Sequence, residues 1–373
     1  MRITDVELIQ AVHWPFVRIH TDEGIRGIGE ASLQQKEIAV RAEVQAYRDF
    51  LIGQDPTQIE HIFNALHRRT VWSGGPVTMT AISGIEQALW DIKGKVAGLP
   101  VYELLGGKVR EKVKGYANGW FGGARSPEEL AANAAAVVAE GFDTIKWYPF
   151  GHVAQLITQE EEESAIRHMQ LIREAVGPDV NIAVDVRNRL NTWSAIRMAE
   201  KLKPYEVYWY EEPLLWDNVS ALAEVSRAVD IPIAVGERLY TRWEFREVLE
   251  QNVVRFIQPD ICHAGGIFEL RKIAAMAEVY YVMVAPHNSN GPISTVASIH
   301  LDACTPNAPI QELIHRNLPV YNELLTEPLV VEDGYVHLPT GPGWGVDIVE
   351  DAEELYPPQN LAAIEGNARY YPE

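Results

Sequence analysis

The spacing of apolar residues changes twice along the chain. Over the first forty residues apolar and polar positions alternate, as in residues 16–20, and the turn Asp22-Glu23-Gly24 interrupts the alternation. Such alternation is typical of strands that bury one face. From Glu37 to about Arg69, and again from Thr78 to Ala97, apolar residues recur at helical spacing. The pattern predicts a small lobe made of a sheet followed by helices.

After Lys112 the pattern becomes strand, loop and helix, repeated along the chain. Helical spacing occurs, for example, at residues 127–140, 162–175 and 194–202. The helical segments separate eight short apolar runs, at residues 113–117, 144–148, 181–184, 207–210, 233–235, 255–257, 281–285 and 309–310. Eight alternating units predict a parallel sheet that closes into an α/β barrel. Beyond about Pro328 the pattern changes to short strands and turns rich in proline and glycine.

Composition and charge restrict the classes of partner. The 373 residues are 47% hydrophobic, which is enough to build a large buried core. The 52 acidic and 32 basic residues give a formal net charge of -20. A protein that binds nucleic acid needs a basic face, so we expect no nucleic-acid partner.

The start of the chain and its cysteines indicate a compartment. Only Cys262 and Cys304 occur, so the sequence has neither a disulfide framework nor the spacing of a zinc site. Asp5 and Glu7 lie where a signal peptide would be apolar, and no apolar run reaches membrane-spanning length. We therefore expect a cytoplasmic protein without membrane contact.

Three acidic residues, Asp185, Glu211 and Glu237, each follow the end of a predicted strand. They lie about one strand–helix unit apart, so they should converge at the carboxyl end of the barrel, where barrel enzymes place their sites. Three converging carboxylates repel one another unless a cation neutralises them. Ligation by oxygen alone suits Mg²⁺ or Mn²⁺ and disfavours zinc. Each acid could instead cap the following helix, but three acids in one register favour a metal site.

The same register continues through Asp260, His287 and Glu312. Adjacent strands would place Asp260 beside His287. A carboxylate that accepts one imidazole N–H fixes the tautomer and raises the basicity of the other nitrogen. His287 is therefore the candidate base, while His263 and His315 are expected at the surface or behind the site.

Lys146 and Tyr148 lie two residues apart on the second predicted strand, so both should face the barrel interior. Trp147 should then point outward to the helices. A lysine inside an apolar barrel needs a nearby carboxylate, which either the metal site or a substrate could supply. A register shifted by one residue would instead leave Lys146 among the helices.

These residues, with motifs along nearly the whole chain, resemble the enolase superfamily in its mandelate-racemase-like group. Within that group the chain is similar to the acid-sugar dehydratases that act on galactonate and gluconate. The matching segments are residues 27–32, 81–95 and 116–120, Glu211-Glu212-Pro213, Gly236-Glu237-Arg238, Gln258-Pro259-Asp260 and Ala285-Pro286-His287.

The resemblance implies an α/β fold: a modified (β/α)8 TIM-type barrel, (β/α)7β, under an α+β capping domain. This replaces the count of eight complete units. The implied parts are a capping domain at 1–112, a catalytic barrel at 113–325 and a segment at 326–373 that returns to the cap. We also expect a homo-oligomer.

The resemblance also implies roles for the candidate residues. Asp185, Glu211 and Glu237 would bind one Mg²⁺, His287 with Asp260 would form the base pair, and Glu312 would hydrogen-bond the substrate carboxylate. Arg189 and Trp72 are further candidates for contact with substrate. Specificity is expected near residues 12–20 and in the loop at residues 72–76.

The sequence departs from the dehydratase pattern at one position. The galactonate and gluconate enzymes carry a histidine two residues after the third-strand ligand, and this histidine protonates the leaving hydroxyl. Arg187 occupies that place here, and a guanidinium is a poor proton donor that can still stabilise a leaving oxygen. The second lysine of the racemase Lys-x-Lys pair is replaced by Tyr148. Tyr148 is therefore our first candidate for the general acid and Lys146 the second.

The expected function is that of a Mg²⁺-dependent hydro-lyase in the catabolism of carbohydrate acids. It would remove the proton next to the carboxylate of an aldonate and expel the neighbouring hydroxyl, giving a 2-keto-3-deoxy acid. The alternatives are a cycloisomerase or epimerase of a related acid, and a barrel that binds a sugar acid without catalysis.

Overall fold

The computed structural model describes residues 1–68, 71–150 and 155–361. Arg69, at the end of the predicted helical region, and residues 362–373 of the predicted C-terminal segment lie outside the described residues.

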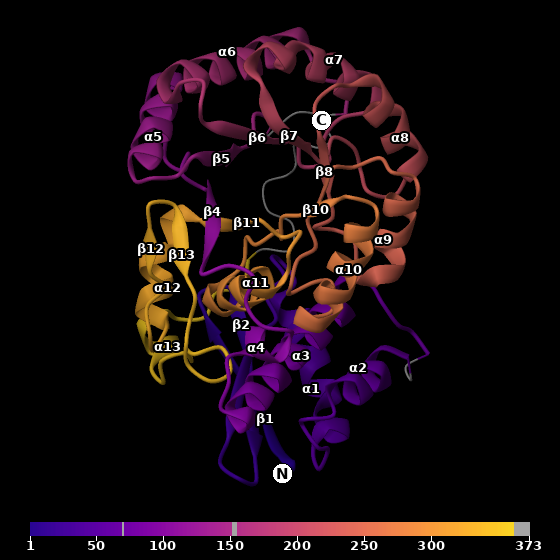
Figure 1. The fold of residues 1–373 in the computed structure, drawn as a ribbon, viewed down its shortest axis with the longest axis vertical. Helices are drawn as coiled ribbons and strands as arrows, with labels where there is room; N and C mark the ends of the chain where they lie inside the picture. Colours follow the sequence, from indigo (N-terminus) through magenta and orange to yellow (C-terminus); the bar gives the residue numbers. More distant parts are fainter. Residues whose placement is uncertain (69–70, 151–154, 362–373) are drawn as a thin grey trace.

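The N-terminal lobe is a three-stranded antiparallel sheet covered by helices, as the pattern predicts (Figure 1). The strands follow in the order β1-β2-β3. The elements are β1 (Ile3–Ala11), β2 (Trp14–Thr21), β3 (Arg26–Glu30), α1 (Glu37–Leu51), α2 (Ile59–Arg68), α3 (Pro76–Ala97) and α4 (Val101–Leu104). The helical region that begins at Glu37 is divided because Gly53 takes a positive φ of 81° and Asp55 forms a turn with Thr57 around Pro56.

Eight strands of the described chain form the barrel. They are β4 (Lys112–Asn118), β5 (Thr144–Trp147), β6 (Asn181–Asp185), β7 (Val207–Glu211), β8 (Ile233–Val235), β9 (Phe256–Ile257), β10 (Met283–Val284) and β11 (Ile310–Ile314). Neighbours from β4 to β10 pair in parallel, and β11 pairs with β4. The Val284 N–H donates to the Asn307 carbonyl just before β11 (2.8 Å), which links the remaining edges. The barrel is therefore closed.

Seven helices alternate with these strands, so the described chain confirms the predicted (β/α)7β order. They are α5 (Pro127–Ala139), α6 (Gln159–Val176), α7 (Thr192–Leu202), α8 (Val219–Ala228), α9 (Thr241–Glu250), α10 (Ile267–Val279) and α11 (Pro292–Cys304). In Figure 1, α5 to α9 form an arc outside the strands, with the N-terminal lobe below. Side chains that accept an N–H from the first turn begin four of these helices, at Ser126, Thr158, Asn191 and Asn218.

The chain after the barrel contacts both parts of the molecule. It contains α12 (Leu318–Leu324), β12 (Val331–Glu332), β13 (Tyr335–His337) and α13 (Ala352–Leu355). The hairpin of β12 and β13 extends the sheet beside β4. Further on, Arg18 of β2 contacts Asp347 (3.1 Å), and the Trp344 indole donates to the Ile28 carbonyl (2.8 Å). Among the described residues, every helix is too short or too polar to cross a lipid bilayer.

Helix α3 joins the lobe to the barrel. Its residues from Met79 to Ile92 are all buried, which is expected for a helix that packs on all sides. The Ser83 hydroxyl accepts the Gly265 N–H (2.9 Å), and the Glu86 carboxylate accepts the N–H groups of Ile267 (2.9 Å) and Phe268 (3.0 Å). The motif at residues 81–95 is thus largely explained by docking between the two parts.

Glycines bring β3 directly against α3. A Cβ at Gly29 would lie 2.0 Å from the Gly84 carbonyl oxygen, and one at Gly27 would lie 2.2 Å from the Ala88 carbonyl oxygen. These neighbours are backbone atoms, so no side-chain rotation can make room. The close contact positions Glu30, at the end of β3, between the lobe and the barrel.

We predict that Gly29→Ala lowers the free energy of unfolding by about 3 kcal/mol, the upper range for overpacking, because β3 must move away from α3. Gly24→Ala is the control: Gly24 has a φ of 76° and no atom near its absent Cβ, so it should cost only about 1 kcal/mol of backbone strain. Denaturant unfolding of both variants measures the difference. Equal losses of unfolding free energy in the two variants would show that β3 and α3 are not in tight contact at Gly29.

Candidate active site

Three carboxylates converge at the carboxyl ends of β6, β7 and β8, as predicted. Asp185, Glu211 and Glu237 each offer an oxygen, and these oxygens all lie within 4.8 Å of one another. Asp185 and Glu211 are paired residues of adjacent strands. Glu237 follows Gly236, whose φ of 145° and close contact with the Gln258 backbone both require glycine. The strand register and one glycine therefore build the cluster.

The cluster fits a hard divalent cation. Burial and the neighbouring Glu211 raise the pKa of Asp185 to about 7, so the carboxylates repel one another as they stand. The donors are all oxygens, which suits Mg²⁺ or Mn²⁺ better than zinc. The Arg187 N–H donates to Asp185 (2.7 Å), and the Trp209 indole (2.9 Å) and Gln258 amide (2.7 Å) donate to Glu211. These contacts hold the carboxylates in place.

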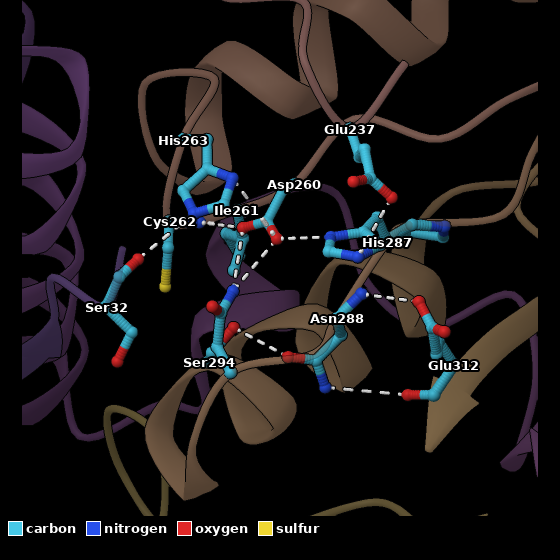
Figure 2. A network of polar contacts seen from close by, with 12 residues as sticks. Ser32, Glu237, Asp260, Ile261, Cys262, His263, His287, Asn288, Ser294 and Glu312 are labelled. Atoms are coloured by element: carbon cyan, nitrogen blue, oxygen red, sulfur yellow. Dashed lines mark hydrogen bonds and ion pairs between the residues drawn. The ribbon is translucent and has the colours of Figure 1, made fainter. Parts of the chain in front are cut away.

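His287 and Asp260 form a hydrogen-bonded pair beside this cluster (Figure 2). The His287 Nδ1 lies 2.7 Å from Asp260 Oδ2, and its Nε2 lies 3.2 Å from Glu237 Oε2. Asp260 also accepts from the Asn290 amide (3.0 and 2.9 Å) and from the Cys262 N–H (2.7 Å). A proton on Nδ1 would satisfy Asp260 and leave Nε2 as the basic nitrogen, directed toward the carboxylate cluster.

The surrounding carboxylates favour a proton on this imidazole. Burial alone would lower the pKa of His287, but Glu237, Glu312 and Asp260 together raise its pKa to about 10. A cation bound by Glu237 would reduce that carboxylate's share of the effect. His287 therefore has a high affinity for a proton at the position where the sequence places the base.

Lys146 faces the barrel interior, which excludes the shifted register. Its side chain is 1% exposed, and its Nζ lies 2.8 Å from Glu211 Oε1 and 2.7 Å from Glu312 Oε1. Trp147 points outward and contacts the His168 ring on α6, with ring centroids 5.9 Å apart. The carboxylate that accounts for the buried lysine therefore belongs to the predicted metal site, with Glu312 as a second partner.

Glu312 is fully buried and surrounded by donors. Besides Lys146, the Asn118 amide (2.7 Å) and the Asn288 N–H (2.8 Å) donate to its oxygens. Although burial opposes ionisation, Lys146 and His287 hold the pKa of Glu312 below its usual value. An ionised carboxylate only accepts hydrogen bonds. Its predicted contact with a substrate carboxylate therefore requires that it take up a proton when the second negative charge approaches.

Arg187 and Tyr148 lie against each other near the cluster. The Arg187 guanidinium carbon is 4.8 Å from the centroid of the Tyr148 ring, which packs edge-on against Phe121 at 4.6 Å. Arg187 is exposed and has a φ of 53°, whereas Tyr148 is half-buried just after β5. Burial raises the pKa of Tyr148, so its hydroxyl keeps its proton.

The other candidates lie farther from the chemistry or behind it. Arg189 is half-buried on the loop that carries Arg187, and Trp72 is 88% exposed in the loop between α2 and α3. His315 pairs with Glu140 (2.7 Å) outside the strands. His263 lies behind Asp260: its Nδ1 is 3.5 Å from Asp260 Oδ2, and its Nε2 is 3.0 Å from the Ser32 carbonyl.

The amides that support the site were not predicted from the sequence. Asn118, Asn288 and Asn290 bond to Glu312 and Asp260, and Gln258 bonds to Glu211. Asn118 and Gln258 lie within the matching motifs, and the other two lie one and three residues after His287, so their place near strand ends was the available signal. Their partners became visible only in the folded chain.

Comparison with known families matches both parts of the chain. Residues 4–106 match the family described as "Mandelate racemase / muconate lactonizing enzyme, N-terminal domain". Residues 129–352 match the family described as "Enolase C-terminal domain-like".

Named relatives and solved structures match nearly the whole chain. The chain is 41% identical over 345 residues to the D-galactonate dehydratase of Ralstonia pickettii, covering 90% of this chain and 89% of the relative. It is 40% identical over 360 residues to the D-galactonate dehydratase of Pectobacterium atrosepticum, covering 94% of this chain and 93% of the relative. A crystal structure of an enolase superfamily member from Salmonella Typhimurium matches with a TM-score of 0.90 at 34% identity, covering 95% of this chain and 98% of that one.

We predict that Lys146→Met lowers the free energy of unfolding of the metal-free protein by about 3–5 kcal/mol, because Glu211 and Glu312 would lose their buried counter-charge. The double variant with Glu312→Gln should recover part of that loss. Denaturant unfolding measures both.

The control is Lys203→Met. Lys203 pairs with Asp230 on the surface, where the two side chains are 53% and 76% exposed, so stability should be nearly unchanged. Equal, small effects at both lysines would contradict the role assigned to Lys146.

Proposed function

Because the chain belongs to the enolase superfamily, we propose that it is a dehydratase that removes water from a sugar acid to give a 2-keto-3-deoxy acid. One observation carries the proposal: His287 Nε2, the ring nitrogen that does not contact Asp260, lies 3.2 Å from Glu237, a member of the three-carboxylate cluster. A base beside a cation site is the arrangement required to remove a proton next to a carboxylate.

The difficult step is removal of that proton, since the substrate gains a second negative charge. In the proposed site Asp185, Glu211 and Glu237 hold one Mg²⁺, which supplies positive charge where the second negative charge develops. His287 accepts the proton at Nε2, and Asp260 holds the ring and stabilises the imidazolium formed. Lys146 fixes the positions of two carboxylates. One is Glu211, which belongs to the cation site, and the other is Glu312, the proposed partner of the substrate carboxylate.

The leaving hydroxyl needs a proton or a counter-charge. Tyr148 retains a hydroxyl proton, and Arg187, stacked on its ring, supplies a permanent positive charge. We assign proton donation to Tyr148 and stabilisation of the departing oxygen to Arg187. A cycloisomerase that breaks a ring ether is the second candidate, because a cation without a transferable proton suits an oxygen that leaves as an anion.

The relatives named D-galactonate dehydratase support an aldonate as substrate. The net charge of -20 supports a small molecule rather than nucleic acid as the partner. We propose division of the chain at residues 112 and 325, since β4 begins at Lys112 and the hairpin of β12 and β13 follows α12.

We predict that the protein with Mg²⁺ forms 2-keto-3-deoxy acids from members of a library of aldonic and aldaric acids. Glu211→Gln should abolish turnover and weaken Mg²⁺ binding, because a ligand and a charge are lost together, while the circular dichroism spectrum stays unchanged. Product formation by chromatography and Mg²⁺ binding by calorimetry provide the two measurements. Undiminished turnover after exhaustive chelation would contradict the metal assignment.

We predict that Tyr148→Phe lowers kcat by roughly 10²–10⁴-fold, the usual effect of losing a general acid. The ring and its contacts with Phe121 and Arg187 are kept, so the loss would report the hydroxyl alone. Steady-state kinetics on the identified substrate measures it. Unchanged turnover would leave Lys146 or the substrate itself as the source of the proton.

Arg187→His separates the two candidate functions. If open-chain aldonates are the substrates, a histidine donor should maintain or increase their dehydration. If Arg187 instead serves a ring oxygen, the native reaction should fall sharply and no aldonate dehydration should appear. Product analysis by NMR distinguishes the two results.

A further inference from the structure

Glu30, at the end of β3 in the N-terminal lobe, contacts a barrel helix directly. Its side chain is completely buried, and its oxygens accept the N–H groups of Gly291 (2.6 Å) and Ser294 (2.9 Å) at the start of α11. The Ser32 hydroxyl donates to the same carboxylate (2.5 Å). A carboxylate is favourable at this end of a helix, where the N–H groups lack partners.

The residues just before α11 include His287 and two asparagines that support the base pair. His287, Asn288 and Asn290 precede Gly291 in the chain. The Asn290 amide donates to both oxygens of Asp260, and the Asn288 N–H donates to Glu312. The Ser294 hydroxyl donates to the Asn288 side chain (2.9 Å). Holding the start of α11 therefore also holds the loop that aligns His287 with Asp260.

A second contact joins the same lobe segment to the Asp260 loop. The Ser32 carbonyl lies 3.0 Å from His263 Nε2 (Figure 2). The Cys262 thiol lies 3.3 Å from the Glu30 carbonyl. The Gln87 amide also donates to the Glu30 carbonyl (3.0 Å). Residues 30–32 thus touch both loops that supply the pair, one through α11 and one through His263.

We propose that Glu30 is a positioning residue for the proton transfer: it sets the alignment of His287 with Asp260 through the start of α11. The inference rests on the proposed function, in which this pair removes the substrate proton. On this account the N-terminal lobe does more than cover the site, because one of its carboxylates determines the geometry of the base. A Cβ at Gly291 would lie 2.9 Å from Glu30 Oε1, so the contact leaves no room for a larger residue.

Glu86 provides a matched control. It is also a buried carboxylate of the N-terminal lobe and caps α10 through Ile267 and Phe268. Burial raises the pKa of Glu30 to about 7 and that of Glu86 to about 8, so the two carboxylates are similarly shielded from water. The start of α10, however, lies farther along the chain from Asp260 than Gly291 lies from His287. Substitution of either glutamate removes a docking contact between the lobe and the barrel. Only substitution of Glu30 should disturb the alignment of His287 with Asp260.

The experiment compares Glu30→Gln with Glu86→Gln. Glutamine keeps the size but turns an N–H donor toward backbone N–H groups, so both variants should show similar falls in melting temperature. Only Glu30→Gln should lower kcat, by about 10–100-fold as for other supporting contacts, with KM nearly unchanged. It should also increase the primary isotope effect with substrate deuterated next to the carboxylate. Ser32→Ala, which removes one donor to Glu30, should act in the same direction by a few-fold and serves if Glu30→Gln does not fold.

A measurement without substrate separates this inference from the proposed function. The His287 Nδ1 proton should give a downfield NMR signal in the ¹⁵N-histidine-labelled protein, shifted or lost in Glu30→Gln and unchanged in Glu86→Gln. Turnover of no sugar acid by the wild type would reject the proposed function, while this signal would still decide the alignment. An unchanged signal together with equal kinetic losses in both variants would overturn the proposal and leave Glu30 as a docking contact.

Discussion

Buried negative charge at the carboxyl end of the barrel is the constraint on which the site depends. Asp185 and Glu211 end strands of one closed sheet, Glu237 and Asp260 follow two further strands within three residues, and Glu312 lies within β11. The register that builds the barrel therefore forces five carboxylates together. Unpaired charges of this kind are too costly to bury. Neighbouring groups offset this cost. Lys146 lies between Glu211 and Glu312, and His287 lies between Glu237 and Asp260. The cluster of three carboxylates fits a divalent cation.

The same solution occurs where the N-terminal lobe meets the barrel. Glu30 and Glu86 are buried acids whose charges face the N-termini of α11 and α10 rather than a cation. Glycines on both sides make these contacts possible, since Gly266 and Gly291 leave space for the two carboxylates. The N-terminal lobe is therefore joined to the loops that carry His287 and Asp260. The position of the lobe should thus affect the geometry of this pair.

Sequence alone predicted the barrel and most of the site because strand ends repeat along the chain. An acid or histidine closely follows six of the eight apolar runs and shows their register, so the cluster and the base pair could be inferred before folding. The two-residue spacing of Lys146 and Tyr148 predicted the inward direction of Lys146. The break between α1 and α2 was not predicted, since a local turn at residues 53–57 overrides a continuous helical pattern. The partners of Glu30, Asn288 and Asn290 could not be inferred either, because they depend on contacts between distant segments.

The proposed reaction depends on His287, held by Asp260 beside the carboxylate cluster, as the group that removes the proton next to the substrate carboxylate. The most direct test follows solvent deuterium into the substrate in the His287→Asn variant, with Mg²⁺ binding measured by calorimetry on the same sample. We expect that Mg²⁺ still binds, because the three carboxylates are intact, and that no deuterium enters the carbon next to the carboxylate. Deuterium that still enters at the wild-type rate would show that another residue is the base.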